Sequence, residues 1–249
     1  MKIGACALNH IMEEQKVMNY EQMSNNKVYL CGEIVSDPVF SHEIYGEGFY
    51  EMFVSVARLS EQKDILPITI SERLLVEGGI KRGNVIAVSG QFRSYNKVEE
   101  GRSRLMLTVF VREIMPPQQS KNPNQITLTG YICKPPVYRT TPFAREITDL
   151  LLAVNRAYNK SDYIPCIAWG RNARYVRNLK VGDKITISGR IQSREYQKKL
   201  DEERVETRTA YEVSVSKIYD EGIEVSPEML VNKEHDAEIA SQNMQNILM

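Results

Sequence analysis

The chain lacks the features that mark membrane-spanning, secreted and metal-binding proteins. No apolar run approaches the ~18–20 residues that a membrane span needs. The start of the chain has only a short apolar stretch with no small-residue cleavage site after it, so no secretory signal is predicted and a cytoplasmic location is expected. Cys6, Cys31, Cys133 and Cys166 include no CxxC pair, and three of them lie in apolar strand patterns, which favours buried, reduced thiols.

Catalytic signatures are also missing. His10, His42 and His235 lie in three separate segments, and none has a Cys or His at ligand spacing. There is no Walker loop, no GxGxxG and no GxSxG motif. Carboxylates are abundant, but they lie in expected turns and near the end of the chain, which is typical of solvated surface charge. The sequence therefore predicts a protein that is not an enzyme and that holds no metal or cofactor.

The chain has no net charge, yet its charges are segregated. Residues 124–219 hold 17 Lys/Arg and 10 Asp/Glu, a net charge of +7, whereas residues 220–249 hold 1 and 7, a net charge of −6. Residues 26–114, with 11 and 12, are almost neutral. A basic region followed by an acidic tail indicates a polyanionic partner, with a tail that competes for the same surface.

The sequence repeats itself, which is its most informative feature. Asn26 and Asn124 begin two copies at an offset of 98 (124 − 26), and one inserted residue then raises the offset to 99. A steady offset with matching glycines and prolines indicates two copies of one fold unit. The further matched pairs are Gly32/Gly130, Pro38/Pro136, Val39/Val137, Arg58/Arg156, Asp64/Asp162, Pro67/Pro165, Arg73/Arg171, Gly83/Gly182, Gly90/Gly189 and Ser94/Ser193.

Each copy shows three alternating strands, a short helix and two more strands, which is the order of a five-stranded OB barrel. The fold class predicted is all-β, with two tandem five-stranded OB-fold barrels, each with a short helix between strands 3 and 4. The strands expected are Lys27–Val35, Phe49–Arg58, Leu66–Ser71, Val85–Tyr95, Leu105–Ile114, Ile126–Cys133, Glu146–Arg156, Tyr163–Trp169, Lys184–Glu195 and Thr207–Ile218. The helices expected are Glu72–Glu77 and Asn172–Asn178.

These elements divide the chain into five parts. OB domain 1 is predicted over 26–114 and OB domain 2 over 124–219, joined by the Pro-rich linker 115–123. The leader 1–25 is expected to be disordered, because termini order only when they are tied down. Translation from Met18 is an alternative start, since Glu13–Glu14 could be encoded by a purine-rich sequence just upstream. The acidic tail 220–249 has too little apolar content for a core.

Outward aromatic residues lie among cations in the second unit. A single nucleic-acid strand offers a phosphate and a flat base at each nucleotide; cations bind the first and aromatic rings stack on the second. For any one tyrosine, ordinary packing in the strand is about as good an explanation, but four such residues near strand ends favour binding. The stacking candidates are Tyr158, Tyr163, Trp169 and Tyr196, and the phosphate-binding candidates are Arg156, Lys160, Arg171, Arg174, Arg190, Arg194 and Lys198.

Blocks across almost all of 124–219 resemble the bacterial single-stranded DNA-binding protein (SSB) family, in family order. They are Asn124–Gly130, Leu152–Tyr158, Ile164–Arg171, Val181–Asp183 and Ser188–Tyr196. The resemblance implies an OB barrel whose stacking positions fall on the four aromatic residues named above, and an assembly that presents four OB domains to one DNA strand. It also implies a nucleoid-associated place in the cytoplasm.

The first unit and the tail depart from the family pattern. In the first unit, Ser60, Ile65, Ser71 and Lys97 stand where the second has its four aromatic residues. Domain 1 is therefore expected to have a degenerate binding face, with secondary candidates Arg58, Arg73, Arg93 and Tyr95. The tail is acidic but lacks the family's tip of several Asp followed by Pro-Phe, which weakens the expectation that it recruits replication or repair proteins.

The function predicted is sequence-independent binding and protection of single-stranded DNA in replication, recombination or repair, mainly through OB domain 2. A homodimer would supply four OB domains, and no membrane partner is expected. Two alternatives stay open: an OB-fold protein–protein adaptor in a replication or mobile-element complex, with the aromatic residues as interface anchors, and an RNA-binding OB protein.

Overall fold

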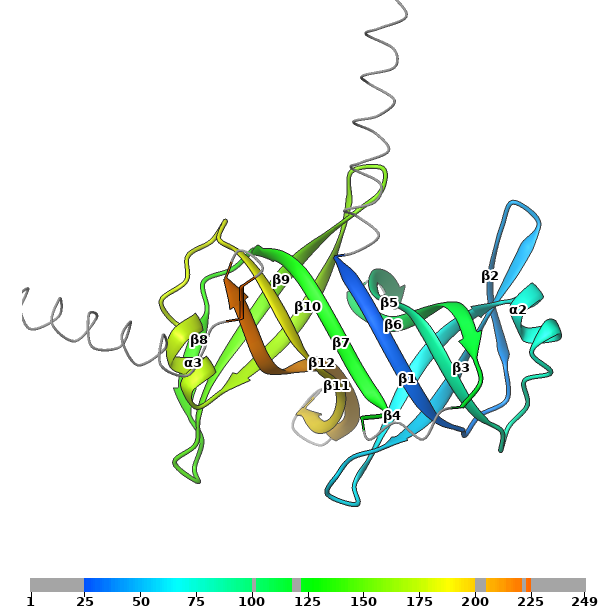
Figure 1. The fold of residues 1–249 in the computed structure, drawn as a ribbon, viewed down its shortest axis with the longest axis horizontal. Coiled ribbons are helices and arrows are strands. Elements are labelled where there is room, and N and C mark those ends of the chain that lie inside the picture. The colour runs from blue at the N-terminus through cyan, green and yellow to red at the C-terminus, as the bar shows by residue number, and fades with distance from the viewer. Residues whose placement is uncertain (1–24, 100–101, 118–121, 200–204, 221–222, 225–249) are drawn as a thin grey trace, which may run out of the picture.

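The computed structural model describes residues 25–99, 102–117, 122–199, 205–220 and 223–224. The leader, apart from Asn25, and most of the acidic tail lie outside the described residues. The described chain is mostly β-strand, arranged as two tandem barrels with one short helix each (Figure 1), which confirms the predicted fold class. Its helices are too short and too polar to cross a membrane.

The first barrel follows the predicted order, with one additional strand. Its helix α2 (Glu72–Glu77) begins after Ser71, whose side chain accepts a hydrogen bond from the backbone N–H of Leu74. The strands are β1 (Asn26–Ile34), β2 (Val39–Ile44), β3 (Glu47–Ala57), β4 (Lys63–Ser71), β5 (Val85–Glu99) and β6 (Arg102–Met115).

The second barrel repeats this order element by element. Its helix α3 (Arg171–Val176) lies between the same two strands as α2 does in the first barrel. The strands are β7 (Asn124–Ile132), β8 (Val137–Thr140), β9 (Glu146–Arg156), β10 (Lys160–Trp169), β11 (Lys184–Lys199) and β12 (Val205–Asp220), followed by the two-residue β13 (Ile223–Glu224).

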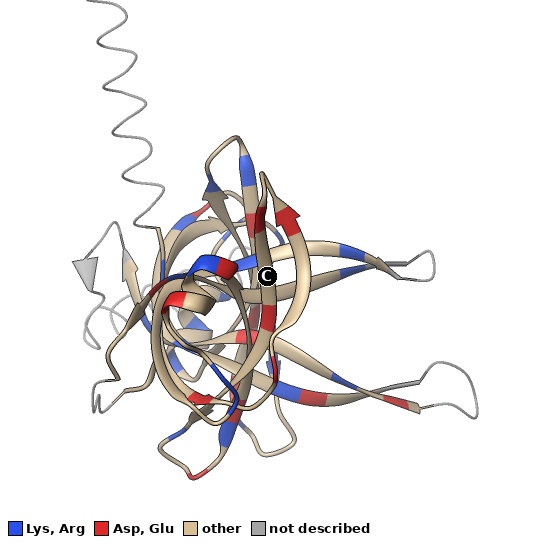
Figure 2. Ribbon diagram, turned by 90° about the vertical axis from the view of Figure 1, so that its right-hand side faces the viewer, with Lys and Arg blue, Asp and Glu red and all other residues tan. Residues whose placement is uncertain are grey.

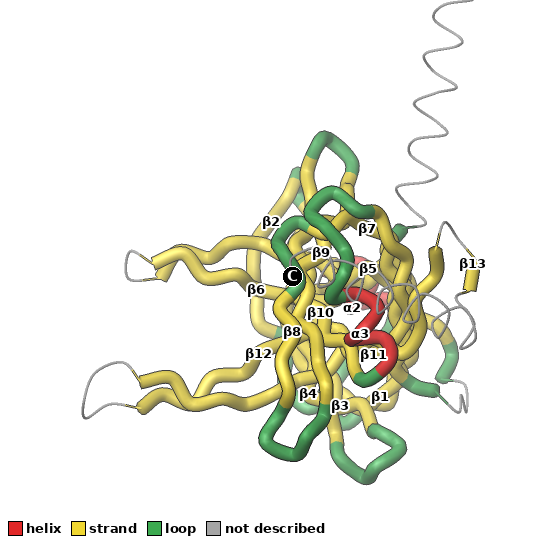
Figure 3. Tube along the Cα trace, turned by 90° about the vertical axis from the view of Figure 1, so that its left-hand side faces the viewer, coloured by secondary structure: helices red, strands yellow, loops and turns green. Residues whose placement is uncertain are grey.

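Three strands, β2, β8 and the two-residue β13, were not predicted, and two hairpins are longer than predicted. Every residue of β2 is exposed, and β8 has four residues of which one is half-buried, so neither shows the apolar alternation that predicts a strand. The hairpins β5–β6 and β11–β12 extend beyond their barrels through polar residues. Both project from the same side of the molecule (Figure 3).

The repeated glycines Gly32 and Gly130 stand where a strand crosses close to its neighbour. A Cβ at Gly32 would lie 2.3 Å from the carbonyl oxygen of Ser55, and one at Gly130 would lie 2.7 Å from that of Ala153. At these places β1 pairs with β3, and β7 pairs with β9, to close each barrel. Both copies therefore have glycine at this position, because a side chain would not fit.

The two barrels share one sheet, because β1 pairs antiparallel with β7. Asn26 lies opposite Leu128, and Leu30 lies opposite Asn124. The strand order β2-β3-β4-β6-β5-β1-β7-β11-β12-β10-β9-β8 is symmetric about this junction, which lies at the centre of Figure 1. The two domains are thus related by an approximate twofold axis between β1 and β7.

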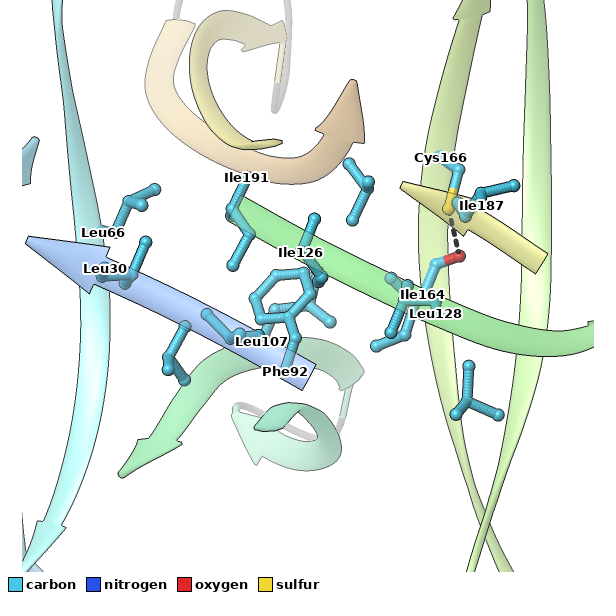
Figure 4. Packing of buried hydrophobic residues seen from close by; sticks show 14 of the residues in the cluster. Leu30, Leu66, Phe92, Leu107, Ile126, Leu128, Ile164, Cys166, Ile187 and Ile191 are labelled. Carbon is cyan, nitrogen blue, oxygen red and sulfur yellow. Dashed lines mark hydrogen bonds between the residues drawn. The ribbon is translucent and has the colours of Figure 1, made fainter. Parts of the chain in front are cut away.

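The apolar core runs from one barrel into the other. Leu30, Phe92 and Ile126 are almost wholly buried and belong to one cluster that continues to Ile187 and Ile191 (Figure 4). Asn26 and Asn124 are buried beside it. The side-chain amide of Asn26 donates to the backbone C=O of Phe92 and accepts from its N–H, and Asn124 does the same with Ile191, at 2.7–2.9 Å. These matched asparagines fix β5 and β11 against the junction strands.

Candidate nucleic-acid interface

Tyr163 and Trp169 lie on the outer face of β10, where alternate residues point away from the barrel. Asp162, Ile164, Cys166 and Ala168, which alternate with the residues of that face, are buried, as the period of two requires. Tyr163 is 46% exposed and Trp169 is 38% exposed. Both side chains are therefore partly packed and partly open to solvent.

Tyr196 shares this face, although it lies on a different strand. Ile167 of β10 lies opposite Ser214 of β12, and Ser214 lies opposite Arg190 of β11, so these three side chains point the same way. Tyr196 is six residues beyond Arg190 on the same strand and has the same orientation. The guanidinium of Arg194 lies 6.0 Å from the Tyr196 ring centroid.

Tyr158 lies at the turn between β9 and β10 and is 95% exposed. Its φ is +60° and that of Asn159 is +53°, a conformation that tyrosine adopts at a cost. Nothing in the barrel packs against this ring, so its exposure is set by the turn. The structure thus brings three of the four predicted aromatic residues onto one face and places the fourth at the turn beside it.

The predicted cations fall into three groups. Lys160 and Arg171 are exposed, and no ion pair of theirs is found within the described part of the chain. Arg174 pairs with the partly exposed Glu146 at 3.3 Å, and the exposed Arg194 pairs with the buried Glu212 at 3.7 Å. The side chain of Lys198 lies outside the described residues.

Arg156 and Arg190 form the third group, because both lie at the contact between the barrels. Asp64 of domain 1 is buried and accepts hydrogen bonds from the Arg58 guanidinium, from Nη1 of Arg190 at 3.2 Å and from the backbone N–H of Ser193 at 2.8 Å. The sequence predicted Arg190 to bind phosphate and gave Arg58 as a secondary candidate of domain 1. The structure gives both a role in joining the domains, and nucleic-acid contact by either stays a prediction.

The twofold-related contact repeats this pattern around Asp162 of domain 2. Its carboxylate accepts from Arg156 at 3.3 Å and from the backbone N–H of Ser94 at 2.8 Å. Burial raises the pKa of Asp162, with hydrogen bonding from Ser94 and the charges of Arg156 and Arg93 acting in the opposite sense. The backbone N–H of Tyr163 donates to Ser94 Oγ at 2.8 Å, so domain 1 directly supports the strand that carries Tyr163.

The corresponding face of domain 1 has different residues. Ile65 is 39% exposed at the place of Tyr163, and Tyr95 donates to Glu51 at 3.0 Å. Arg93 lies over the Phe110 ring, 4.1 Å from its centroid, while Arg73 is exposed on α2. Sequence reasoning missed Phe53, which is 40% exposed between the buried Met52 and Val54 of β3; that alternation was the available signal.

In the described ranges, no group of three or more His, Cys, Asp or Glu side chains is placed to hold a metal ion. Burial raises the pKa of the Cys166 thiol, which favours the unreactive protonated form. The exposed rings and guanidinium groups are suited to binding an anionic polymer that carries flat rings.

A sequence model described as the single-strand binding protein family matches residues 123–219. The chain is 37% identical over 81 residues to single-stranded DNA-binding protein 1 of Staphylococcus aureus, which covers 30% of this chain and 48% of that protein. It is 37% identical over 83 residues to the single-stranded DNA-binding protein of Clostridium tetani, covering 30% of this chain and 57% of that protein. The chain thus spans about half the length of the curated relatives it matches.

A solved structure extends the likeness to both barrels. The wild-type single-stranded DNA binding protein from Thermus aquaticus has a TM-score of 0.61 and 20% sequence identity, covering 78% of this chain and 91% of that one. At that identity the likeness concerns the fold. Residues 123–219 of the chain thus match the single-strand binding protein family, and they lie beside a second OB barrel.

Proposed function

We propose that the chain binds single-stranded DNA without sequence preference, mainly through domain 2, and protects it in replication, recombination or repair. The observation that carries the proposal is the shared outward face of Tyr163, Trp169 and Tyr196. Each ring offers a flat surface on which a base of any identity stacks. Phosphates would be bound by the exposed cations Lys160 and Arg171, with Arg174 available after exchange of its surface ion pair with Glu146. Arg194 would bind phosphate through the exposed part of its guanidinium while it stays paired with Glu212.

Domain 1 serves first as support for this face. Ser94 of domain 1 accepts a hydrogen bond from the backbone N–H of Tyr163, and β1 pairs with the edge strand β7. Domain 1 thus stabilises strands of domain 2 from outside that domain. A second copy of the chain would give four barrels for one DNA strand. A dimer predicts twice the chain mass in sedimentation equilibrium, whereas a single-chain mass would contradict it.

Trp169, the only tryptophan, provides the test of DNA binding. We expect oligo(dT) to quench its fluorescence in a saturable manner, and we expect the affinity to fall as salt rises, because bound phosphates release counterions. Absence of quenching, together with unchanged anisotropy of a labelled oligo(dT), would contradict the proposal and favour a protein–protein adaptor. Equal competition by oligo(U) would favour a binder that does not distinguish RNA from DNA.

A further inference from the structure

The two symmetry-related contacts between the barrels differ in charge. Gly90 pairs with Val111, and the equivalent Gly189 pairs with Val215. A residue of β6 therefore corresponds to the residue of β12 that lies 104 positions later (215 − 111). Around Asp64, the six equivalent positions carry two Arg, one Asp and one Glu, so their charges cancel; around Asp162 they carry three Arg and one Asp, a net charge of +2. The equivalent pairs are Arg58/Arg156, Asp64/Asp162, Arg190/Gln91, Gln192/Arg93, Glu212/Thr108 and Ser216/Arg112.

The excess charge lies on β5 and β6 of domain 1. Nη2 of Arg93 and Nη2 of Arg112 both donate to Oε1 of Gln91 at 3.0 Å, so one neutral oxygen holds two guanidinium groups together. Among the described residues, neither arginine makes an ion pair with a carboxylate. Nε of Arg93 is buried and has no hydrogen-bond partner.

The crowding of cations also affects Arg93 itself. Burial, together with the charges of Arg156 and Arg112, lowers the pKa of Arg93 to about 10, against the opposing charge of Asp162. An anion placed here would relieve this repulsion. The twofold-related contact has an additional carboxylate, because Glu212 there accepts from Gln192 at 2.7 Å and also pairs with Arg194 at 3.7 Å.

We propose that Arg93, Arg112 and Arg156 bind one backbone phosphate of the DNA strand at the boundary between the barrels. Arg93 is followed in β5 by Ser94, whose Oγ accepts from the backbone N–H of Tyr163 at 2.8 Å, so this arginine cluster lies beside the end of β10 that carries Tyr163. The strand would leave that face near Tyr163 and continue onto β5 and β6 of domain 1. The inference rests on the proposed function, and it gives domain 1 a direct part in binding.

The test is Gln91→Glu in the full-length chain. The substitution is isosteric and puts a carboxylate between Arg93 and Arg112, so it keeps both hydrogen bonds and supplies the missing negative charge. We expect a thermal midpoint no lower than that of the wild type but weaker binding of oligo(dT). The slope of log affinity against log salt should become shallower by about 0.7, the value for loss of one phosphate contact on a single strand.

Gln62→Glu is the matched control. Gln62 Oε1 accepts from Arg58 Nη1 at 3.1 Å on the twofold-related side, so this variant adds the same charge beside an arginine outside the cluster. We expect it to leave the salt slope unchanged. Arg112→Gln, at an exposed position, should reproduce the smaller slope of Gln91→Glu by removing a cation instead of adding an anion.

The outcomes separate the two proposals. A wild-type chain that does not bind oligo(dT) would overturn the proposed function and this inference with it. A wild-type chain that binds, with an unchanged slope in both Gln91→Glu and Arg112→Gln, would overturn the inference alone. If the effect of Gln91→Glu disappears on oligonucleotides too short to leave domain 2, the path across the boundary is supported.

Discussion

At the scale of single residues, exposure separates the aromatic side chains that are free to stack from those that pack. Tyr158 is 95% exposed at the β9–β10 turn, and Tyr45 is 105% exposed at the β2–β3 turn of domain 1. Both residues have positive φ, at +60° and +51°. The two tyrosines are therefore matched in local strain and solvation, and they differ in the face that they border.

Tyr158→Ala is expected to weaken oligo(dT) binding while Tyr45→Ala leaves it unchanged. Loss of one base–aromatic stack costs about 1–3 kcal/mol, which corresponds to a roughly 5- to 150-fold weaker affinity. Fluorescence titration of both variants measures the difference. Equal affinities for the two variants would show that Tyr158 does not stack on DNA.

Asp162 predicts a dependence of stability on pH. Its pKa is raised in the folded protein, chiefly by burial, so the folded state binds a proton more readily than the unfolded state does. Ionised Asp162 therefore costs stability above its folded pKa, and stability is gained as pH falls from that value towards the ordinary aspartate value of about 3.9.

The comparison with Asp162→Asn isolates this residue from the other carboxylates. The free energy of unfolding of the wild type minus that of the variant should increase as pH is lowered through that window, measured by urea unfolding. A difference that decreases with falling pH would mean that the hydrogen bonds from Ser94 and Arg156 outweigh burial.

At the scale of elements, the hairpins β5–β6 and β11–β12 exchange support across the junction. Ser94 Oγ accepts from the backbone N–H of Tyr163 at 2.8 Å, and Ser193 Oγ accepts from that of Ile65 at 3.2 Å. Figure 2 shows basic residues on the projecting part of both hairpins and acidic residues on that of one of them. The two contacts are equivalent by symmetry, but only one supports a strand with an exposed tyrosine.

Ser94→Ala and Ser193→Ala should therefore have similar effects on stability and different effects on binding. Each leaves a backbone N–H without its partner, which costs about 0.5–1.5 kcal/mol in the free energy of unfolding. Ser94→Ala should also weaken oligo(dT) binding, because Tyr163 loses its anchor. Urea unfolding and fluorescence titration check both parts, and an equal loss of affinity in the two variants would contradict the role of Ser94.

The repeat made the elements predictable. It also contains a repeated Arg/Asp pair whose structural role was not predicted. Matched glycines and strand patterns located both barrels, whereas the exposed β2 and β8 carried no apolar alternation. Arg58/Asp64 and Arg156/Asp162 occur in both copies, including the copy that lacks the aromatic residues. A pair kept where binding positions have changed indicates a structural role, and the two carboxylates indeed hold the opposite domain.

At the scale of the whole molecule, the continuous core predicts that the barrels unfold together. Leu30 of β1 is fully buried beside the junction with β7, and Trp169 reports from the other domain. Leu30→Ala should destabilise the chain by about 2–5 kcal/mol, and it should lower the transition seen by Trp169 fluorescence as much as that seen by circular dichroism.

Val76→Ala on α2, where the side chain is 73% exposed, is the control and should leave both transitions in place. Separate transitions in the Leu30→Ala chain, with Trp169 unaffected, would show that the domains unfold independently. Coincident transitions would mean that stability measured in either barrel is a property of the pair.

The pairing of β1 with β7 within one chain has a consequence for dilute solution. Two separate barrels would meet with a probability set by their concentration and would part when diluted. Here only residues 116–123 separate the last strand of the first barrel from β7, so each edge strand meets its partner at an effective concentration on the order of millimolar. The spacing between the two faces therefore stays constant even when the protein is scarce.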